Sequence, residues 1–217
     1  MDSATARRLV DALAGWSRDV GWRIDGWAAL AAIGLLWRPP DTILYAEGPS
    51  RPGSTQLDAA HQRLHRITGI HIGPCRHQAG SPTRGTVELA DHRGRCSQQL
   101  ILAPSARPRP AVQIDPPHLL RTPPLDQLLA RRIRLLATPA VDARRRHNAT
   151  VDACALATIL PDRDRHRLTA RLAPPTLASA VAVVSRLEPD VLQAVDSDHH
   201  DEVVDGLARL SQLCSSP

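Results

Sequence analysis

The sequence contains no phenylalanine and no lysine, and only one tyrosine, one methionine and four tryptophans among its 217 residues. With 42% apolar residues a core is possible, but aliphatic side chains and alanine must fill most of it. All the tryptophans and the tyrosine lie between Trp16 and Tyr45, so the bulky aromatic packing is confined to the N-terminal part. Because lysine is absent, every basic side chain is an arginine, a bias that suggests a GC-rich coding sequence.

Closely spaced cysteine pairs and targeting segments are also absent. The four cysteines, at positions 75, 96, 154 and 214, form no CxxC pair. No signal peptide is evident, and no apolar run approaches the roughly 20 residues that span a bilayer. These absences predict a cytoplasmic protein with free thiols and no membrane partner.

The formal net charge is +5 and the sequence pI is about 9.8. A basic chain attracts nucleic acids, although the charge is modest for this length. The strongest basic run is ARRRHN, residues 143–148, which favours either a contact with RNA or nucleotide phosphates or a solvated turn between helices. Few aromatic residues lie nearby, which argues against stacking on single-stranded bases.

Hydrophobic spacing and turn residues predict an α/β (α+β) chain with an α/β domain over 1–118 and a helical bundle over 119–217. In the first part the patterns predict a mixed sheet with flanking helices. Expected helices cover 4–19, 27–36 and 57–66, and expected strands cover 20–24, 42–46, 70–72, 86–89, 99–102 and 111–114. In the second part helices are expected over 122–136, 148–160, 168–172, 176–187 and 201–213.

Four motifs follow one another in the order Asp25-Gly26-Trp27, Arg38-Pro39-Pro40, TPPLDQLLARRIRLL (122–136) and RRRHNATVDACALATIL (144–160). The first is similar to a Gly-Gly-Ser/Thr turn, the second to an Arg-Pro-Thr before a metal-binding strand, and the last two to a pair of downstream helices. In this order they resemble the AbiEii-type nucleotidyltransferase-like proteins of bacterial toxin–antitoxin and abortive-infection systems. The resemblance covers about residues 5–165 and implies a nucleotidyltransferase fold.

The resemblance also implies a set of site residues. Gly26 would approach a phosphate, and two carboxylates on the following strand would hold Mg²⁺ for transfer from an NTP. The alignment places those carboxylates at Thr42 and Leu44, which leaves Asp41 one position away. Further carboxylates would come from Glu88 or Asp91, so Asp41, Glu88 and Asp91 are the catalytic candidates. Of these, Asp41 and Glu88 are the candidate metal ligands.

Arginines complete the implied site. Arg38, Arg131, Arg132 and Arg145 are expected to contact the nucleotide or an RNA acceptor, with Arg144 and Arg146 beside them. Because Thr42 and Leu44 replace carboxylates, we expect the fold to be kept and NTP transfer to be weak or absent. The alternative is a non-enzymatic scaffold that binds a protein partner, a toxin or antitoxin, or a nucleic acid.

Three other clusters offer metal ligands. His61 and His65 are one helical turn apart, but HQRLH lacks the glutamate of a zinc protease. The pairs Cys75/His77 and His92/Cys96 would supply the ligands of a structural zinc site. The run DSDHHDE (196–202) indicates either a cation site or an acidic start to the last helix.

Overall fold

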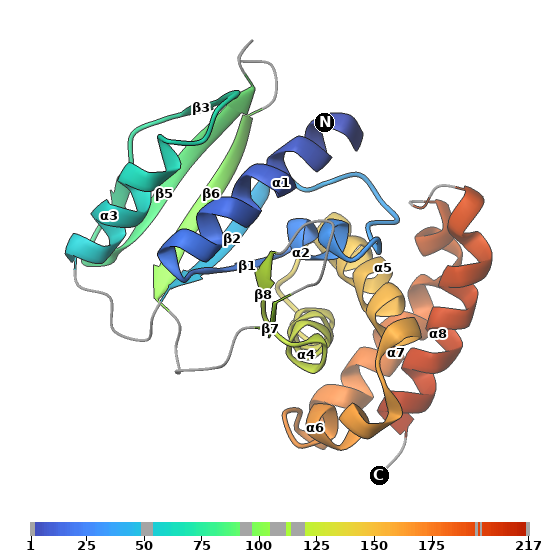
Figure 1. Ribbon diagram of the computed structural model, residues 1–217. Coiled ribbons are helices and arrows are strands. Elements are labelled where there is room, and N and C mark those ends of the chain that lie inside the picture. Colours follow the sequence, from blue (N-terminus) through green and yellow to red (C-terminus); the bar gives the residue numbers. More distant parts are fainter. Residues whose placement is uncertain are drawn as a thin grey trace. The chain divides into compact units, whose positions relative to one another are not determined.

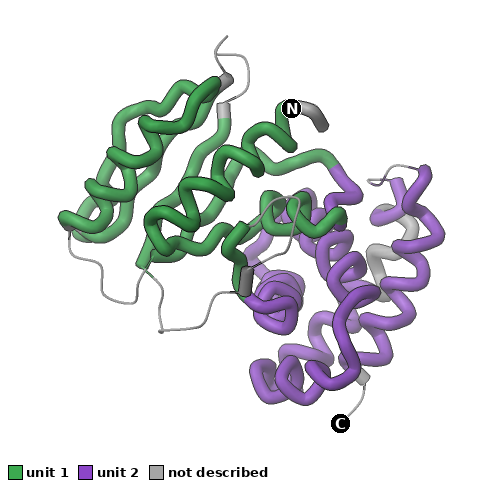
Figure 2. The backbone as a smooth tube through the Cα atoms, viewed as in Figure 1, with its two compact units in different colours: residues 1–34, 39–123 green, residues 35–38, 124–217 purple. Residues whose placement is uncertain are grey.

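The computed structural model describes residues 3–48, 54–91, 97–104, 112–113, 120–193, 195 and 197–215. The chain divides into two compact units, distinguished by colour in Figure 2. Unit 1 comprises Met1–Gly34 and Pro39–Pro123, and unit 2 comprises Leu35–Arg38 and Pro124–Pro217. The expected domain boundary at 118/119 lies outside the described residues.

Unit 1 opens with the helices and strands that the periodicity predicted, with shifted ends. The second helix is shorter than expected, because Gly34 takes a positive φ of 76° that ends the helical path after Ala32. Pro39 and Pro40 then prevent a new turn before the next strand. The elements are α1 (Ser3–Val20), β1 (Arg23–Asp25), α2 (Trp27–Ala32), β2 (Ile43–Gly48) and α3 (Ser54–Leu64).

The sheet of unit 1 is mixed, as expected. Its strand order is β1-β2-β6-β5-β3, with β4 beside β5, and only the β2–β6 pair is parallel. Sequence reasoning missed β4, whose residues are all exposed and carry no hydrophobic pattern. The remaining strands are β3 (Ile70–Ile72), β4 (Arg76–Gln78), β5 (Ser81–Asp91), β6 (Ser97–Pro104) and the small pair β7 (Val112–Gln113) and β8 (Arg121–Thr122).

Strand register divides the sheet into two faces. Leu44, Leu100 and Val87 are cross-strand partners and are all fully buried, so they define the core face. The neighbouring row, in which Ile43 pairs with Gln99 and Gln99 with Glu88, lies on the opposite, second face. The residues of the second face in β1 and β2 are Arg23, Asp25, Ile43, Tyr45 and Glu47.

Helices α1 and α3 lie on one side of the sheet (Figure 1). They are tied together by the Trp16 indole, which donates a 2.9 Å hydrogen bond to the Ala60 carbonyl. A Cβ built on Gly85 would lie 3.4 Å from the Leu57 side chain, which places α3 over the core face. This helical layer covers the core face, and the charged side chains of β1 and β2 lie on the second face.

Unit 2 is helical, as expected. Close packing of its helices is clearest at Gly206, where an added Cβ would lie 2.8 Å from the Cβ of Cys154. No helix among the described residues is long and apolar enough to cross a membrane. The elements are α4 (Leu125–Leu136), α5 (Ala143–Ile159), α6 (Arg165–Thr169), α7 (Pro174–Gln193) and α8 (His200–Ser215), with short 3-10 turns at Asp162–Asp164 and Ser197–His199.

Candidate functional site

The turn between β1 and α2 has the glycine that the motif predicted. Gly26 has φ 84° and ψ −152°, a conformation that side-chain-bearing residues rarely adopt. Its backbone N–H donates a 2.6 Å hydrogen bond to Oδ1 of Asp25. The N–H expected to approach a phosphate is therefore already paired with a carboxylate.

The segment after α2 offers no carboxylate at the two positions where the resemblance places them. Leu44 is 0% exposed and belongs to the core face beneath the helical layer. Thr42 is exposed, and its carbonyl accepts a 2.8 Å hydrogen bond from the backbone N–H of Gln99. Tertiary structure thus uses both positions to build the sheet.

Two of the remaining carboxylate candidates, Asp41 and Glu88, have well-separated backbones. Asp41 is half-buried just before β2, whereas Glu88 is exposed on β5, two strands away. Two strand spacings put their backbones about 10 Å apart. Oxygens sharing one Mg²⁺ lie within about 4 Å of each other, so both side chains would have to extend toward each other to share an ion. Asp91 is the last residue of β5, where its backbone pairs with Ile70.

No group of three potential metal-binding side chains gathers within the part of the chain that the structure describes. The described candidates Asp41 and Glu88 stand two strands apart, so this part of the chain shows no clustered carboxylate set of the kind that holds Mg²⁺ in a nucleotidyl-transfer enzyme.

The second face instead carries a pair that sequence reasoning missed. Nη2 of Arg23 lies 2.6 Å from Oε2 of Glu47, and the two residues are directly opposite in the β1–β2 ladder. Arg23 and Asp25 are 4% and 5% exposed. Nη1 of Arg23 and the indole nitrogen of Trp27 are buried without a hydrogen-bond partner. Only strand pairing reveals this cluster, because 24 positions separate Arg23 from Glu47 in sequence.

Two of the predicted nucleotide-binding arginines meet on one buried carboxylate in unit 2. Arg38 forms a two-pronged pair with Asp152, with Nε–Oδ1 at 2.8 Å and Nη2–Oδ2 at 2.9 Å. Nε of Arg132 lies 2.9 Å from the same Oδ2. Arg38 and Asp152 are 4% and 3% exposed. This Arg38–Asp152–Arg132 triad holds the segment Leu35–Arg38 against helices α4 and α5.

The basic run 143–148 begins helix α5 and does not form the turn between helices. The side chain of Asp142 caps the helix by accepting from the backbone N–H of Arg145 at 2.9 Å. Arg144 and Arg145 are exposed, and Arg131 is half-exposed on α4. Arg146 folds back, and its Nη2 donates to the carbonyls of Pro139 and Val141 at 3.1 Å.

The histidine-rich region makes local contacts. The His61 and His65 rings meet edge to face at 4.8 Å, and Nε2 of His61 lies 2.9 Å from the Gly73 carbonyl oxygen. His77 lies 3.7 Å from Asp58, and both are about half-exposed. His92 and Cys96, the second half of the expected zinc site, lie outside the described residues.

The acidic run 196–202 leads into α8 and includes its first residues, in agreement with one of its two interpretations, although Asp196 itself is not described. His199 stacks on Trp37 with ring centroids 5.6 Å apart and planes 17° apart. Asp201 and Glu202 lie in the first turn of α8, where the helix dipole stabilises negative charge.

The described cysteines are unsuited to nucleophilic catalysis. Burial, helped by the charge of Asp152, raises the pKa of Cys154 to about 12. Burial raises the pKa of Cys214 to about 11, and burial and Asp58 raise that of Cys75. Each thiol is therefore protonated at neutral pH.

Comparisons with known proteins identify the fold. No protein-family model matches the chain, and no curated protein matches its sequence. A protein from H. pylori with a provisional nucleotidyltransferase assignment superposes with a TM-score of 0.60 at 12% identity, over 98% of this chain and 94% of that one. JHP933 from Helicobacter pylori superposes with a TM-score of 0.58 at 14% identity, over 98% and 91% of the two chains. The chain thus has a nucleotidyltransferase-like fold.

Proposed function

We propose that this chain is a nucleotidyltransferase-fold protein of the toxin–antitoxin or abortive-infection type, with weak or no NTP-transfer activity, that acts as a binding scaffold. The observation that supports the proposal is the set of side chains that strand β2 presents on its two faces. Its core face presents Leu44 and Ala46, which are 0% and 1% exposed. Its second face presents Ile43, Tyr45 and Glu47, of which only Glu47 is a carboxylate, and that carboxylate is paired with Arg23.

Metal-dependent phosphoryl transfer needs carboxylates held close together, because neutralising the charge that develops is most of the catalysis. Alternate residues of a strand share a face, so a metal-binding pair needs two acidic residues two positions apart. Glu47 is the only acidic residue of β2, and the nearest acidic residue before it in sequence is Asp41, which precedes the strand. A site with one carboxylate at this strand supports binding better than transfer.

The toxin–antitoxin role, with a toxin or antitoxin protein as partner, rests on the sequence resemblance. Among the described residues only Ile159 and Val204 are large hydrophobic side chains with substantial exposure, at 40% and 45%. Isolated exposed apolar residues are ordinary on protein surfaces. A partner of this chain would therefore be recognised mainly through polar and charged contacts.

A radiolabelled-NTP transfer assay tests the proposal. The purified chain is incubated with each of the four NTPs, Mg²⁺ or Mn²⁺, and either RNA or a host protein extract. The matched control is the Asp41→Ala/Glu88→Gln variant, which removes both candidate metal ligands. We expect the same background labelling from both proteins. Robust labelling by the natural chain that the variant loses contradicts the proposal.

A further inference from the structure

The two units differ in net charge and in how their arginines are paired. By sequence, unit 1 has 14 arginines against 10 acidic residues, a net charge of +4, whereas unit 2 has 13 against 12, a net charge of +1. Most of the net positive charge therefore belongs to unit 1, although the ARRRHN run lies in the helical unit. Several unit 1 guanidinium groups have no hydrogen-bond or ion-pair partner among the described residues: Arg7, Arg8, Arg18, Arg66, Arg76, Arg84 and Arg121.

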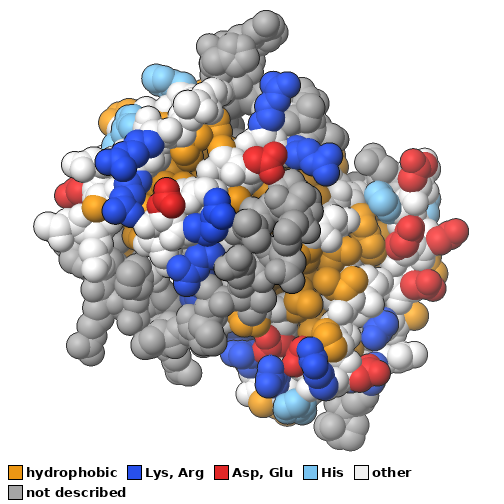
Figure 3. Space-filling view, viewed as in Figure 1, with side chains coloured by type: hydrophobic (Ala, Val, Ile, Leu, Met, Phe, Trp, Pro, Cys, Tyr) orange, Lys and Arg blue, Asp and Glu red, His pale blue; other side chains and the backbone are white. Residues whose placement is uncertain are grey.

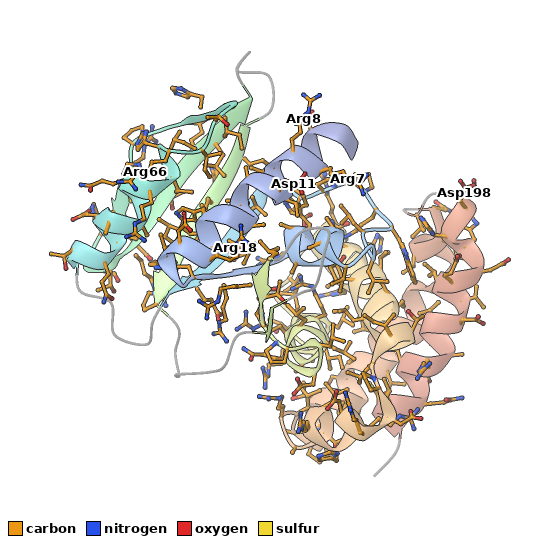
Figure 4. All side chains as sticks on the ribbon, viewed as in Figure 1. Arg7, Arg8, Asp11, Arg18, Arg66 and Asp198 are labelled. Carbon is orange, nitrogen blue, oxygen red and sulfur yellow. The ribbon has the colours of Figure 1, made fainter. Side chains whose placement is uncertain are left out.

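Four of these arginines are exposed on the helical layer of unit 1. Arg7, Arg8 and Arg18 project from α1, and Arg66 projects from the turn that follows α3 (Figure 4). Figure 3 shows blue arginine side chains spread over this side of unit 1, with few red carboxylates between them. We call the surface formed by Arg7, Arg8, Arg18 and Arg66 the basic layer.

Helix geometry aligns part of the basic layer. Arg7 and Arg18 are eleven residues apart, close to three full turns, so they lie on the same side of α1 about 16 Å from each other. The guanidinium of Arg63 adds charge at the end of this row, because it donates to the Asp19 carbonyl in the last turn of α1. Nη1 of Arg121 also lies there, 3.5 Å from where a Cβ on Gly21 would be.

We propose that the basic layer binds the phosphate backbone of a double-helical nucleic acid without reading its sequence. Guanidinium groups suit phosphate because they donate two hydrogen bonds in one plane, and unpaired groups break no internal contact when they do so. Duplexes carry one negative charge per roughly 1.7 Å of axis, which supplies several phosphates along a 16 Å row. Asp11, Asp19 and Asp58 interrupt the layer, so binding is weak and sensitive to salt.

The aromatic residues decide between duplex and single strand. Non-specific single-strand binding depends on exposed aromatic rings on which bases stack. Trp16, Trp22, Trp27 and Trp37 are at most 6% exposed, and Tyr45 is only half-exposed on the second face. Phenylalanine is absent from the chain. The arginine side chains of the basic layer are therefore suited to contacts with the phosphate backbone of a duplex.

The test measures binding of the full chain to 20-base-pair RNA and DNA duplexes by fluorescence anisotropy across a range of salt concentrations. The variant Arg7→Ala/Arg8→Ala/Arg18→Ala is expected to reduce the slope of log K against log salt by about 2.7, or 0.9 per arginine, and to weaken binding at least about tenfold. The single variant Arg18→Ala is expected to reduce the slope by about 0.9.

A matched control makes the same change in charge elsewhere. Arg76→Ala/Arg84→Ala/Arg163→Ala removes three exposed arginines that have no hydrogen-bond or ion-pair partner among the described residues, two from β4 and β5 on the second face and one from unit 2. We expect this variant to bind nearly as tightly as the natural chain, and unfolding midpoints to match for all three proteins. Equal weakening by both triple variants shows attraction to net charge alone and overturns the proposal.

Other ligands complete the test. Tighter binding to a single strand than to a duplex contradicts the duplex assignment, and equal binding to vesicles containing anionic phospholipid contradicts the nucleic-acid assignment. The binding measurement involves no NTP. If the chain fails to bind duplexes, the proposed absence of NTP transfer is unaffected, and if the chain transfers NTP, the proposed duplex binding is unaffected.

Discussion

The two units of this chain use the same basic side chain in opposite ways. In unit 2, guanidinium groups hold the helices together, most clearly where Arg38 and Arg132 meet Asp152, which is 3% exposed. In unit 1, a core of aliphatic and tryptophan side chains under α1 and α3 supports the sheet, and the exposed Arg7, Arg8, Arg18 and Arg66 have no hydrogen-bond or ion-pair partner among the described residues. An arginine that is internally paired supports the fold, whereas an unpaired one is available to a ligand.

The largest expected effect is on the triad of unit 2. Asp152→Ala leaves two guanidinium groups without their carboxylate, and removing one partner of a buried pair costs about 3–5 kcal/mol of unfolding free energy. Chemical denaturation measures the loss. Asp162→Ala is the control, because Asp162 is 80% exposed and its pair with Arg165 contributes at most about 1 kcal/mol. Similar losses for both variants would remove the distinction between the triad and a surface pair.

The second prediction concerns the main exception in unit 1, the Arg23–Glu47 pair. Glu47→Ala leaves Arg23, which is 4% exposed, without this carboxylate and is expected to cost about 1–3 kcal/mol. The loss is smaller than for Asp152 because Glu47 is 21% exposed and pairs with one arginine. Urea unfolding of the variant provides the measurement. A loss larger than that of Asp152→Ala would reverse the order of the two units.

Thiol chemistry gives a third comparison. The experiment uses a Cys96→Ser background at pH 8. Cys75 of unit 1 is expected to react with a disulfide reagent in the native state. Cys154 is expected to react only after unfolding, because it is buried and burial raises its pKa to about 12. The folded pKa lies above the ordinary value of 9.0, so the stability that Cys154 contributes is complete below pH 9 and is lost as pH rises toward 12. Rapid native labelling of Cys154 would contradict this.

The smallest effect is expected on the basic layer. Arg18→Ala and Arg66→Ala remove exposed side chains that pair with nothing in the described part of the chain, so each is expected to change the unfolding free energy by no more than about 0.5 kcal/mol. Arg171→Ala in unit 2 serves as the contrast, because it leaves Asp126, whose side chain is 5% exposed, without this arginine. If Arg18→Ala destabilised the protein as much as Arg171→Ala, the unpaired arginines would have a structural role.

Helix and strand positions were readable from the sequence where hydrophobic spacing was regular. The expected helix over 4–19 and the strand over 70–72 are confirmed, because burial in those segments follows one period. Ends set by backbone conformation were less accessible, as the early stop of α2 before Gly34 shows. The exposed strand β4 was missed, since it has no buried residues to leave a pattern.

By itself, the sequence determined an α/β chain with aliphatic packing, a Gly26 turn, and Thr42 and Leu44 at the positions of a carboxylate pair. These are local properties of residue type and spacing. Only the tertiary structure decided which charges are used internally, because Arg38 and Asp152 are 114 positions apart and meet only after folding. Likewise, strand pairing separated Asp41 from Glu88 and joined Arg23 to Glu47, because register is fixed by contacts between distant segments.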